Sequence, residues 1–541
     1  MCVDEIISIK VLRFFGVGIE QTPPLWYNFI QFLMTNRLRD FKGRDMAKDN
    51  FGFEHKSGIL MAVSSLPSKY GIGTFGAPCR RFVDFLRATG TKCWQILPLN
   101  PTAYGDSPYQ SPSSFAGNPY FIDLEALKKK GLLKEQELKG AMHDSVGVDY
   151  GWLWQTRFEV LKRAYERFEK DDKFALFCEK NASWLDDYAY FTALKVAFGH
   201  KAWIEWDEEY RFYARALAHR SEHAQEIDFW KFVQYIFFTQ WAEVRAYASK
   251  MGVVIVGDMP IYVAYDSVDV WSNPDQFLLD EDLNPVIVAG CPPDGFAPDG
   301  QLWGNPIYDY QKMEKDGFSW WVSRVKQAFC LYDILRIDHF RGFAGYFAVK
   351  YGEKTARDGE WQKGPDKALF SVINDKVHEA KIIAEDLGFI TQDVRELLDF
   401  CGYPGMKVLQ FAFDNDDSEY LPRKFKDENC IVYTGSHDSP CTASWCKALC
   451  GDTLARFKKE CLRISGGANR TYAMINFAFK SKANLAVVPL QDWMLLPSEQ
   501  ARMNTPSVAE GNWTWRAPMD YDNPQLILRI RKTNERFART N

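Results

Sequence analysis

Charged and polar side chains stand at the ends of several short apolar segments of this sequence. Packing an apolar segment requires none of these groups, and burying an unpaired charge is costly. Several carboxylates that converge on one place therefore indicate either a metal site or acid–base chemistry. The residues concerned are Asp258, Arg336, Asp338, Glu385, Asp414, His437, Asp438 and Asp492.

Asp338 and Glu385 have the residue types needed to cleave a glycosidic bond with retention of configuration. In that reaction one carboxylate attacks the anomeric carbon, while a second protonates the leaving oxygen and later deprotonates the acceptor. The two groups lie about 5–5.5 Å apart. Asp338 and Glu385 end consecutive predicted strands, and neighbouring strands are about 4.8 Å apart. The spacing is therefore compatible with such a pair.

Two further charged residues could adjust this pair. Arg336 precedes Asp338 by two residues, so on a strand both side chains point to the same face. A guanidinium there would keep the carboxylate ionised and orient it. The general acid must keep its proton near neutral pH, which requires burial and nearby negative charge. Asp438 could supply that charge and hold sugar hydroxyls. The alternative is a set of ordinary strand ends with a surface ion pair.

Eight apolar, β-branched segments that end in polar residues or in Gly and Pro are typical of buried parallel strands. Helical patterns lie between most of them, for example CRRFVDFLRATG before the second and TQDVRELLDFCG before the sixth. This alternation predicts an α/β fold with a (β/α)8 TIM barrel, whose chemistry belongs at the carboxyl ends of the strands. The predicted strands are 58–67, 92–101, 252–263, 334–340, 381–388, 405–413, 429–438 and 484–492.

Two intervals between these strands are too long for simple crossovers. They predict insertions at about 102–250, largely helical and rich in aromatic residues, and at about 264–333. Both leave from the carboxyl ends of the strands, so we expect them to wall and cover the site. The catalytic barrel is expected over 46–541. Residues 1–45 lack the features of a signal peptide and are expected to be an extension outside the catalytic fold, or an over-long start.

Bulk properties exclude several classes of function. A net charge of −5 leaves no basic surplus for a nucleic acid. The 12 cysteines form no CxxC pairs, which is typical of a reduced, cytoplasmic enzyme. The sequence has no run of about 18 apolar residues, so we expect no membrane span. It has no phosphate-binding loop or convincing dinucleotide fingerprint, so we expect no nucleotide cofactor. Nothing requires a metal, and the oligomeric state cannot be read from the sequence.

Long motifs make the sequence resemble the 4-α-glucanotransferases called amylomaltases or disproportionating enzymes, of the α-amylase superfamily. The resemblance covers about residue 56 to the C-terminus. It implies transfer of α-1,4-glucan segments, with maltooligosaccharides as donors and glucans or glucose as acceptors. The motifs are GDMPIYV, RIDHFRG, AEDLG, PGMKVLQFAFD, YTGSHD, PPDGFAPDGQLWGNP, PLNPTAYGDSPYQSPSSFAGNPYFIDL and NWTWR.

The resemblance also implies roles for particular residues. Asp338 matches the nucleophile, Glu385 the general acid/base and Asp438 a third carboxylate that grips the sugar at the cleavage point. Arg336 and His437 match the residues that flank these carboxylates. The remaining matches are substrate-contacting positions: Tyr109 and Asp258 near the same subsite, Trp303 and Asn305 in the loop that covers the donor, and Tyr104 as a glucan-contacting aromatic.

The sequence departs from the family pattern at two places. Gly295 stands where the covering loop usually has Tyr, and Ser436 and Ser439 flank His437–Asp438 in place of Thr and Asn. Neither change removes a carboxylate. Gly295 is expected to loosen the loop, because Gly restricts the backbone least.

The residues by themselves leave three alternatives open. An α-glucan hydrolase would use the same carboxylates and differ in how water reaches the intermediate. A catalytically inactive glycan-binding protein is argued against by the intact set of Asp338, Glu385 and Asp438. A metal-dependent barrel hydrolase would use the same carboxylates as ligands.

Overall fold

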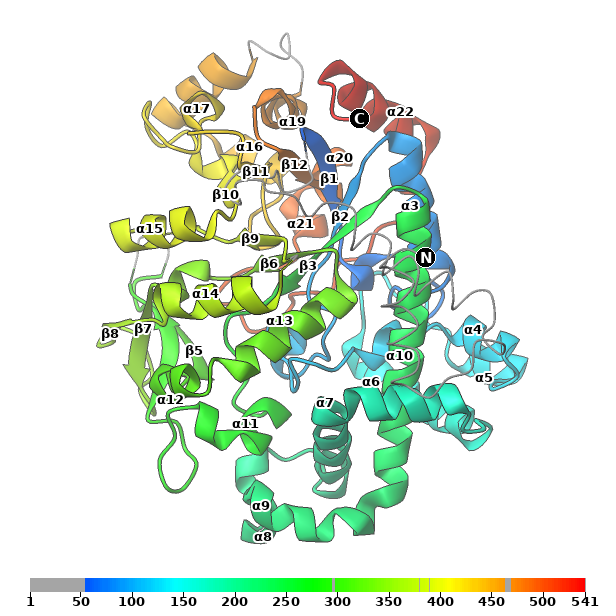
Figure 1. The fold of residues 1–541 in the computed structure, drawn as a ribbon. Coiled ribbons are helices and arrows are strands. Elements are labelled where there is room, and N and C mark those ends of the chain that lie inside the picture. The colour runs from blue at the N-terminus through cyan, green and yellow to red at the C-terminus, as the bar shows by residue number, and fades with distance from the viewer. Residues whose placement is uncertain (1–53, 294–296, 379, 389, 463–468, 541) are drawn as a thin grey trace, which may run out of the picture. The chain divides into compact units, whose positions relative to one another are not determined.

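Eight parallel strands close into a barrel (Figure 1). The structure is a computed structural model that describes residues 54–293, 297–378, 380–388, 390–462 and 469–540. Each segment predicted as a strand overlaps one barrel strand, so the predicted barrel is confirmed. In spatial order the strands are β1 (Lys56–Leu60), β12 (Leu485–Pro489), β11 (Cys430–Tyr433), β10 (Gly405–Val408), β9 (Ile382–Ala384), β6 (Ile334–Ile337), β3 (Val254–Met259) and β2 (Cys93–Gln95).

The register of three neighbouring strands determines where along the barrel axis the polar residues lie. β3 pairs with β6 so that Asp258 lies opposite Arg336. β6 pairs with β9 so that Ile337 lies opposite Ala384. Asp338 and Glu385 each follow one residue later, so they leave adjacent strands at the same level.

Helices with clear end signals connect the strands. α3 (Ala77–Thr89) has Pro near its start and ends at Gly90, whose φ of 76° is left-handed. α15 (Gln392–Cys401) ends in the same way at Gly402, with φ of 69°. Glycine adopts this conformation without strain, which is why it ends both helices. The other connecting helices are α13 (Ser319–Leu331), α14 (Asp366–Lys376), α16 (Thr442–Ala448), α17 (Gly451–Phe457), α19 (Arg470–Lys480) and, after β12, α22 (Pro524–Arg536).

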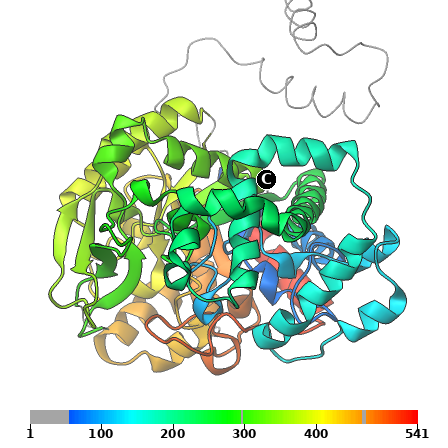
Figure 2. The same cartoon turned by 90° about the horizontal axis from the view of Figure 1, so that it is seen from below.

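The segment between β2 and β3 is mainly helical, and its helices gather beside one another in Figures 1 and 2. Gln234 and Gln240 each pair through the side-chain amide with both backbone groups of one residue, Gly117 and Asp123 respectively. These pairs hold the loop that follows β2. The helices are α4 (Leu124–Lys129), α5 (Glu135–Gly140), α6 (Tyr150–Glu166), α7 (Asp172–Ala197), α8 (Glu208–Arg211), α9 (Tyr213–Ala216) and α10 (Ala224–Lys250).

A second, antiparallel sheet of four strands was not predicted. Its order is β5 (Gln301–Pro306), β4 (Ile287–Cys291), β7 (Gly345–Lys350) and β8 (Glu360–Lys363). β4 and β5 belong to the segment between β3 and β6, together with α11 (Val268–Ser272) and α12 (Tyr310–Lys315). β7 and β8 come from the connection after β6, where no insertion is predicted from the sequence.

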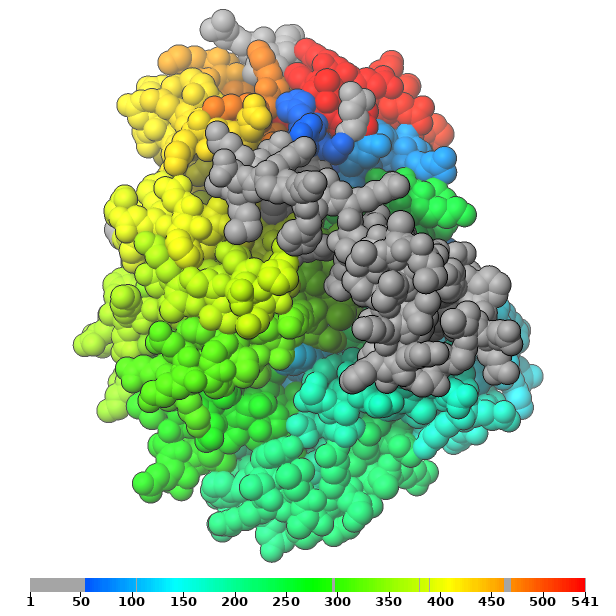
Figure 3. All heavy atoms as spheres, in the orientation of Figure 1, coloured from blue at the N-terminus to red at the C-terminus, as the bar shows by residue number. Residues whose placement is uncertain are grey.

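Figure 3 shows the described surface, with residues of the β2–β3 segment in cyan to green at the bottom of the view. Within the described part of the chain, no helix has the length and apolar character needed to span a membrane. The expected extension at 1–45 lies outside the described residues, as does Gly295.

Candidate active site

Arg336 lies between two carboxylates at the carboxyl ends of β3 and β6. Its Nη1 donates to both carboxylate oxygens of Asp258 at 2.7 Å, and its Nη2 lies 2.9 Å from Asp338 Oδ1. The Arg336 and Asp258 side chains are 3% and 0% exposed, whereas that of Asp338 is 27% exposed. Asp338 is therefore the member of this group that a substrate can reach.

The two carboxylates determine the charge state of this arginine. Burial alone would lower the pKa of Arg336, but Asp258 and Asp338 raise it well above its usual value. Burial also raises the pKa of Asp258, an effect that Arg336 opposes. Arg336 therefore remains a fixed cation beside Asp338.

Glu385 reaches back to the segment that carries Asp338. Its Oε2 accepts the backbone N–H of His339 at 2.7 Å, and its Oε1 accepts that of Leu387 at 2.8 Å. Because His339 directly follows Asp338, these bonds hold the Glu385 carboxyl beside Asp338. Burial raises the pKa of Glu385 to about 7, the charge of Asp338 adds to the effect, and Arg336 and the two N–H groups oppose it. Glu385 can thus hold or release a proton near neutral pH.

His437 and Asp438 follow β11 and form an ion pair, with Nε2 and Oδ2 3.2 Å apart. Asn504 donates from Nδ2 to Asp438 Oδ1 at 2.6 Å, and its backbone N–H bonds to the His437 carbonyl. Burial would raise the pKa of Asp438, but His437 and Asn504 lower it to about 2. Asp438 is therefore ionised at neutral pH.

Ser436 and Ser439, the two departures from the family motif, are partners in the structure. The Ser436 backbone N–H donates to Ser439 Oγ at 3.0 Å, and the two hydroxyl oxygens lie 3.2 Å apart. Ser436 Oγ also accepts the Asp438 N–H at 3.3 Å. The pair closes the turn that presents Asp438.

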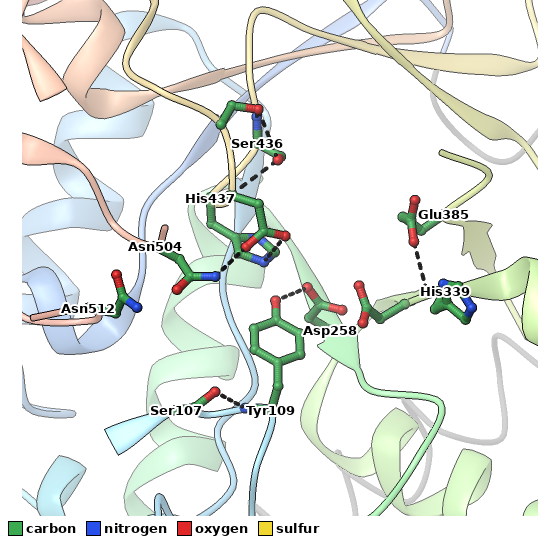
Figure 4. A network of polar contacts seen from close by, with 12 residues as sticks. Ser107, Tyr109, Asp258, His339, Glu385, Ser436, His437, Asn504 and Asn512 are labelled. Atoms are coloured by element: carbon green, nitrogen blue, oxygen red, sulfur yellow. Dashed lines mark hydrogen bonds and ion pairs between the residues drawn. The ribbon is translucent and has the colours of Figure 1, made fainter. Parts of the chain in front are cut away.

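Tyr109 links the Arg336 group to the His437 group, and Figure 4 shows it beside Asp258 and His437. Its hydroxyl donates to Asp258 Oδ2 at 2.8 Å. Its ring stacks on His437, with centroids 5.1 Å apart and an angle of 18°, and lies 5.6 Å from the ring of Trp513. The structure therefore brings Tyr109, Asp258, Arg336, Asp338, Glu385, His437 and Asp438 together.

Trp303 and Asn305 lie on β5. The Trp303 ring meets that of His339 edge to face at 4.8 Å, which brings β5 next to the residue after Asp338. Asn305 donates from Nδ2 to the Val263 carbonyl at 2.7 Å, and its Oδ1 accepts from Gln110 Nε2 at 3.3 Å. Tyr104 starts a short 3-10 turn at Tyr104–Asp106, and its side chain lies outside the described part of the structure.

The two other carboxylates at predicted strand ends, those of Asp492 and Asp414, have different surroundings. Asp492 is 1% exposed and accepts hydrogen bonds from Thr434 and from the hydroxyl and N–H of Thr442. It therefore joins the ends of β11 and β12. Asp414 has an exposed side chain, and its backbone carbonyl accepts from Arg456.

Three further residues, His339, Asn504 and Trp513, contact the site and are not among the predicted site residues. His339 lies inside the RIDHF motif and adopts a left-handed backbone with φ of 49°, which turns its N–H toward Glu385. Trp513 belongs to the quoted NWTWR motif, so family resemblance was the available signal for both. Asn504 lies in a loop after β12 and carries no periodic or motif signal.

In the described residues, no group of three or more His, Cys, Asp and Glu side chains is arranged to hold a metal ion. The Arg336 guanidinium sits between Asp258 and Asp338. What the arrangement offers is one partly exposed carboxylate beside a cation, one carboxyl that titrates near pH 7 and one carboxylate that stays ionised. Such unequal carboxyl groups are typical of acid–base and nucleophilic chemistry at a glycosidic bond.

Comparisons with known proteins identify the family of the chain. A family model described as 4-alpha-glucanotransferase matches residues 61–520. A 4-alpha-glucanotransferase of Clostridium butyricum is 45% identical over 487 residues, which cover 88% of this chain and 100% of that protein. One from Thermus thermophilus is 42% identical, covering 89% of this chain and 98% of that protein.

A solved structure leads to the same family. The amylomaltase of Streptococcus agalactiae, in complex with acarbose, superposes with a TM-score of 0.86 at 38% identity, covering 90% of this chain and 100% of that chain. The amylomaltase of Corynebacterium glutamicum has a TM-score of 0.71 at 17% identity and supports the fold. From the family model and these relatives together, the chain belongs to the 4-alpha-glucanotransferase family, glycoside hydrolase family 77.

Proposed function

We propose that Asp338 is the nucleophile and Glu385 the general acid/base of the retaining 4-α-glucanotransferase reaction that this family performs. One observation carries the assignment. Glu385, whose pKa is raised to about 7, is held by the N–H of the residue that follows Asp338. A carboxyl that protonates a leaving group and a carboxylate that attacks must lie side by side in different protonation states.

In the first half-reaction, Asp338 attacks C1 of a donor glucose unit within an α-1,4-glucan. The bond from C1 to the glycosidic oxygen breaks, and Glu385 gives its proton to that oxygen, so the fragment on the reducing side leaves. A covalent glycosyl–Asp338 ester remains. The ion pair from Arg336 Nη2 to Asp338 keeps the attacking carboxylate charged and aimed.

In the second half-reaction, the 4-hydroxyl of a glucan or of glucose attacks C1. Glu385, now ionised, takes the hydroxyl proton, and the bond from C1 to Asp338 breaks. Two inversions at C1 give net retention. A pKa near the working pH lets one residue serve first as acid and then as base.

The neighbouring residues hold the sugar at the cleavage point. Asp438 is 42% exposed at its side chain and ionised, so we assign it hydrogen bonds to sugar hydroxyls that strengthen in the transition state. His437 and Tyr109 lie beside it as a stacked pair. Asp258 is fully buried and acts through Arg336 and Tyr109.

Trp303 and Asn305 are proposed to form the wall over the donor chain, and Tyr104 to offer a further aromatic contact to the glucan. Trp303 is partly exposed next to His339, and Asn305 ties β5 to the segment after β3. Transfer exceeds hydrolysis when the acceptor site is filled and water is kept from the intermediate. This wall is therefore the part of the molecule assigned to keeping water from the intermediate.

Incubation with maltotriose tests the proposal. We expect glucose together with maltooligosaccharides longer than maltotriose. The measurement is the length of the products over time. Only shorter products would instead identify a hydrolase. Asp338→Asn and Glu385→Gln are both expected to lower the rate of transfer by at least a thousandfold, and an unchanged rate in Glu385→Gln would reject its role.

We expect the reaction to proceed without metal or nucleotide, and full activity after exhaustive chelation would support this. A cytoplasmic location remains a prediction. It is supported by the described cysteines, which are all free thiols.

A further inference from the structure

Met406 on β10 contacts the groups that surround both proposed catalytic carboxyls. Its Sδ accepts a hydrogen bond from Arg336 Nε at 3.4 Å. Its backbone N–H donates to Asp386 Oδ1 at 2.6 Å, and Asp386 directly follows Glu385. The Met406 side chain is 1% exposed, so water cannot replace either contact.

The contact supplies an acceptor for the Nε–H of the Arg336 guanidinium. The Nη1 and Nη2 groups pair with Asp258 and Asp338, and the Nε–H donates to Met406 on β10. A buried N–H without an acceptor destabilises the arrangement that leaves it unpaired. The sulfur of Met406 is that acceptor.

A thioether suits this position because it is a weak, uncharged acceptor. A carboxylate here would compete with Asp338 for the guanidinium, and an aliphatic side chain would leave Nε–H unpaired. The neutral sulfur holds the third edge of Arg336 and leaves the charge for the two aspartates.

We propose that Met406 is a positioning residue for the transfer reaction: its sulfur fixes the Arg336 guanidinium in the plane that aims Nη2 at Asp338. The inference rests on the proposed roles of Arg336 and Asp338. The Met406 backbone N–H also holds Asp386, the second residue after β9 and the neighbour of Glu385. The pairing of β9 with β10 is confined to Gly405 and Ala384, so the Met406–Asp386 bond adds to a short ladder.

Met406→Leu tests this, because Leu keeps the volume and removes the acceptor. We expect kcat for maltotriose to fall about tenfold or more, since a hydrogen bond to a charged group is lost, with KM changed less than twofold. Arg336 lowers the pKa of Glu385, so a displaced guanidinium should move the alkaline limb of kcat/KM to higher pH. Asp338 and Tyr420 also act on this carboxyl and stay in place.

Met251→Leu is the matched control. Met251 Sδ also accepts from an arginine, Arg87 Nη1, at 3.1 Å, but on the outside of the barrel next to α3 and α10. This variant is expected to keep the kcat and the pH profile of the parent enzyme. Met406→Gln supplies an oxygen acceptor on an unbranched chain, and we expect it to recover part of the kcat lost in Met406→Leu.

The outcomes separate the inference from the function on which it rests. If the parent enzyme forms no maltooligosaccharide ladder, the proposed function fails. If the parent forms the ladder and folded Met406→Leu matches it in kcat and pH profile, only the role of Met406 is rejected. The role is also rejected if Met406→Gln is no better than Met406→Leu, or if neither variant folds, because Met406 would then serve core packing alone.

Discussion

Glu385 and Asp438 are both carboxylic acids, yet their surroundings set their pKa values to about 7 and about 2. Glu385 is 8% exposed and faces Asp338, so its charged form is disfavoured. Asp438 has His437 and Asn504 as partners, so its charged form is favoured. The different roles proposed for Glu385 and Asp438 follow from these surroundings and not from residue type.

The raised pKa of Glu385 predicts a change of stability with pH. Between about 4.5 and 7 the folded protein holds a proton that the unfolded chain has lost, so stability falls as pH rises through this window. The full cost above pH 7 is on the order of 3 kcal/mol. Glu385→Gln cannot ionise, so it should become more stable relative to the parent between pH 5 and pH 8. Urea unfolding of both proteins at the two pH values measures this, and parallel pH dependence would contradict it.

The Ser436–Ser439 pair predicts a coupled effect on stability. Ser439→Ala removes the acceptor of the Ser436 N–H, and Ser436→Ala removes the acceptor of the Asp438 N–H. Because the hydroxyls are partners, the double variant should lose less free energy of unfolding than the sum of the singles, by about 0.5–1 kcal/mol. Ser371→Ala, on the exposed face of α14, is the control and should add to Ser439→Ala without coupling. Strict additivity of the Ser436 and Ser439 variants would show that the pair does not act as a unit.

The groups that stand at strand ends and in motifs are predictable from the sequence. Asp338, Glu385 and Arg336 are among them, and the strand register places them on or directly after the adjacent strands β6 and β9. Asn504, which contacts Asp438 from a loop 66 residues further along the chain, is not predictable in this way. Such a contact depends on how loops fold over the barrel, and a local sequence pattern does not predict it.

At the scale of elements, apolar segments predicted the barrel but not the sheet of β5, β4, β7 and β8. β8 is mostly exposed and reads EWQK, so it lacks an alternating apolar face. β5 contains Gly and ends in Pro, which are uncommon within strands. Short, polar edge strands of this kind form because a partner strand is available, as β7 is for β8.

The position of β5 predicts that this strand controls the ratio of hydrolysis to transfer. Asn305 connects β5 to the Val263 carbonyl and to Gln110, so Asn305→Ala should loosen the strand that carries Trp303. Water would then reach the glycosyl–Asp338 intermediate more often, and hydrolysis should rise severalfold relative to transfer. Net gain of reducing ends, compared with total glucose released from maltotriose, measures the ratio. Asn284→Ala, in the exposed turn before β4, should leave the ratio unchanged. An unchanged ratio in Asn305→Ala would remove β5 from the proposed wall.

At the scale of the whole described fold, the two ends of the barrel have separate tasks. The candidate site lies at the carboxyl ends of the strands. At the amino ends, Arg539 is 0% exposed and donates to the carbonyls of Lys56, Phe479, Ser481 and Ala483. It therefore ties the last residues after α22 to the start of β1 and to the approach to β12, where the barrel closes.

The contacts of Arg539 predict that substituting this residue lowers the stability of the fold and leaves catalysis unchanged. Arg539→Met keeps the length of the side chain but leaves four carbonyls without their donor, so the free energy of unfolding should fall by about 3–5 kcal/mol. At 25 °C the folded fraction should still transfer glucan at the parent rate, because the site lies at the opposite ends of the strands. Thermal unfolding, together with maltotriose turnover per folded enzyme, measures both quantities.

Arg531→Met removes an exposed arginine that donates to the Ala88 carbonyl, and should change stability by less than about 0.5 kcal/mol. Equal stability of the two variants would show that barrel closure does not depend on Arg539, and a fall in turnover per folded enzyme would show that the two ends of the barrel are coupled.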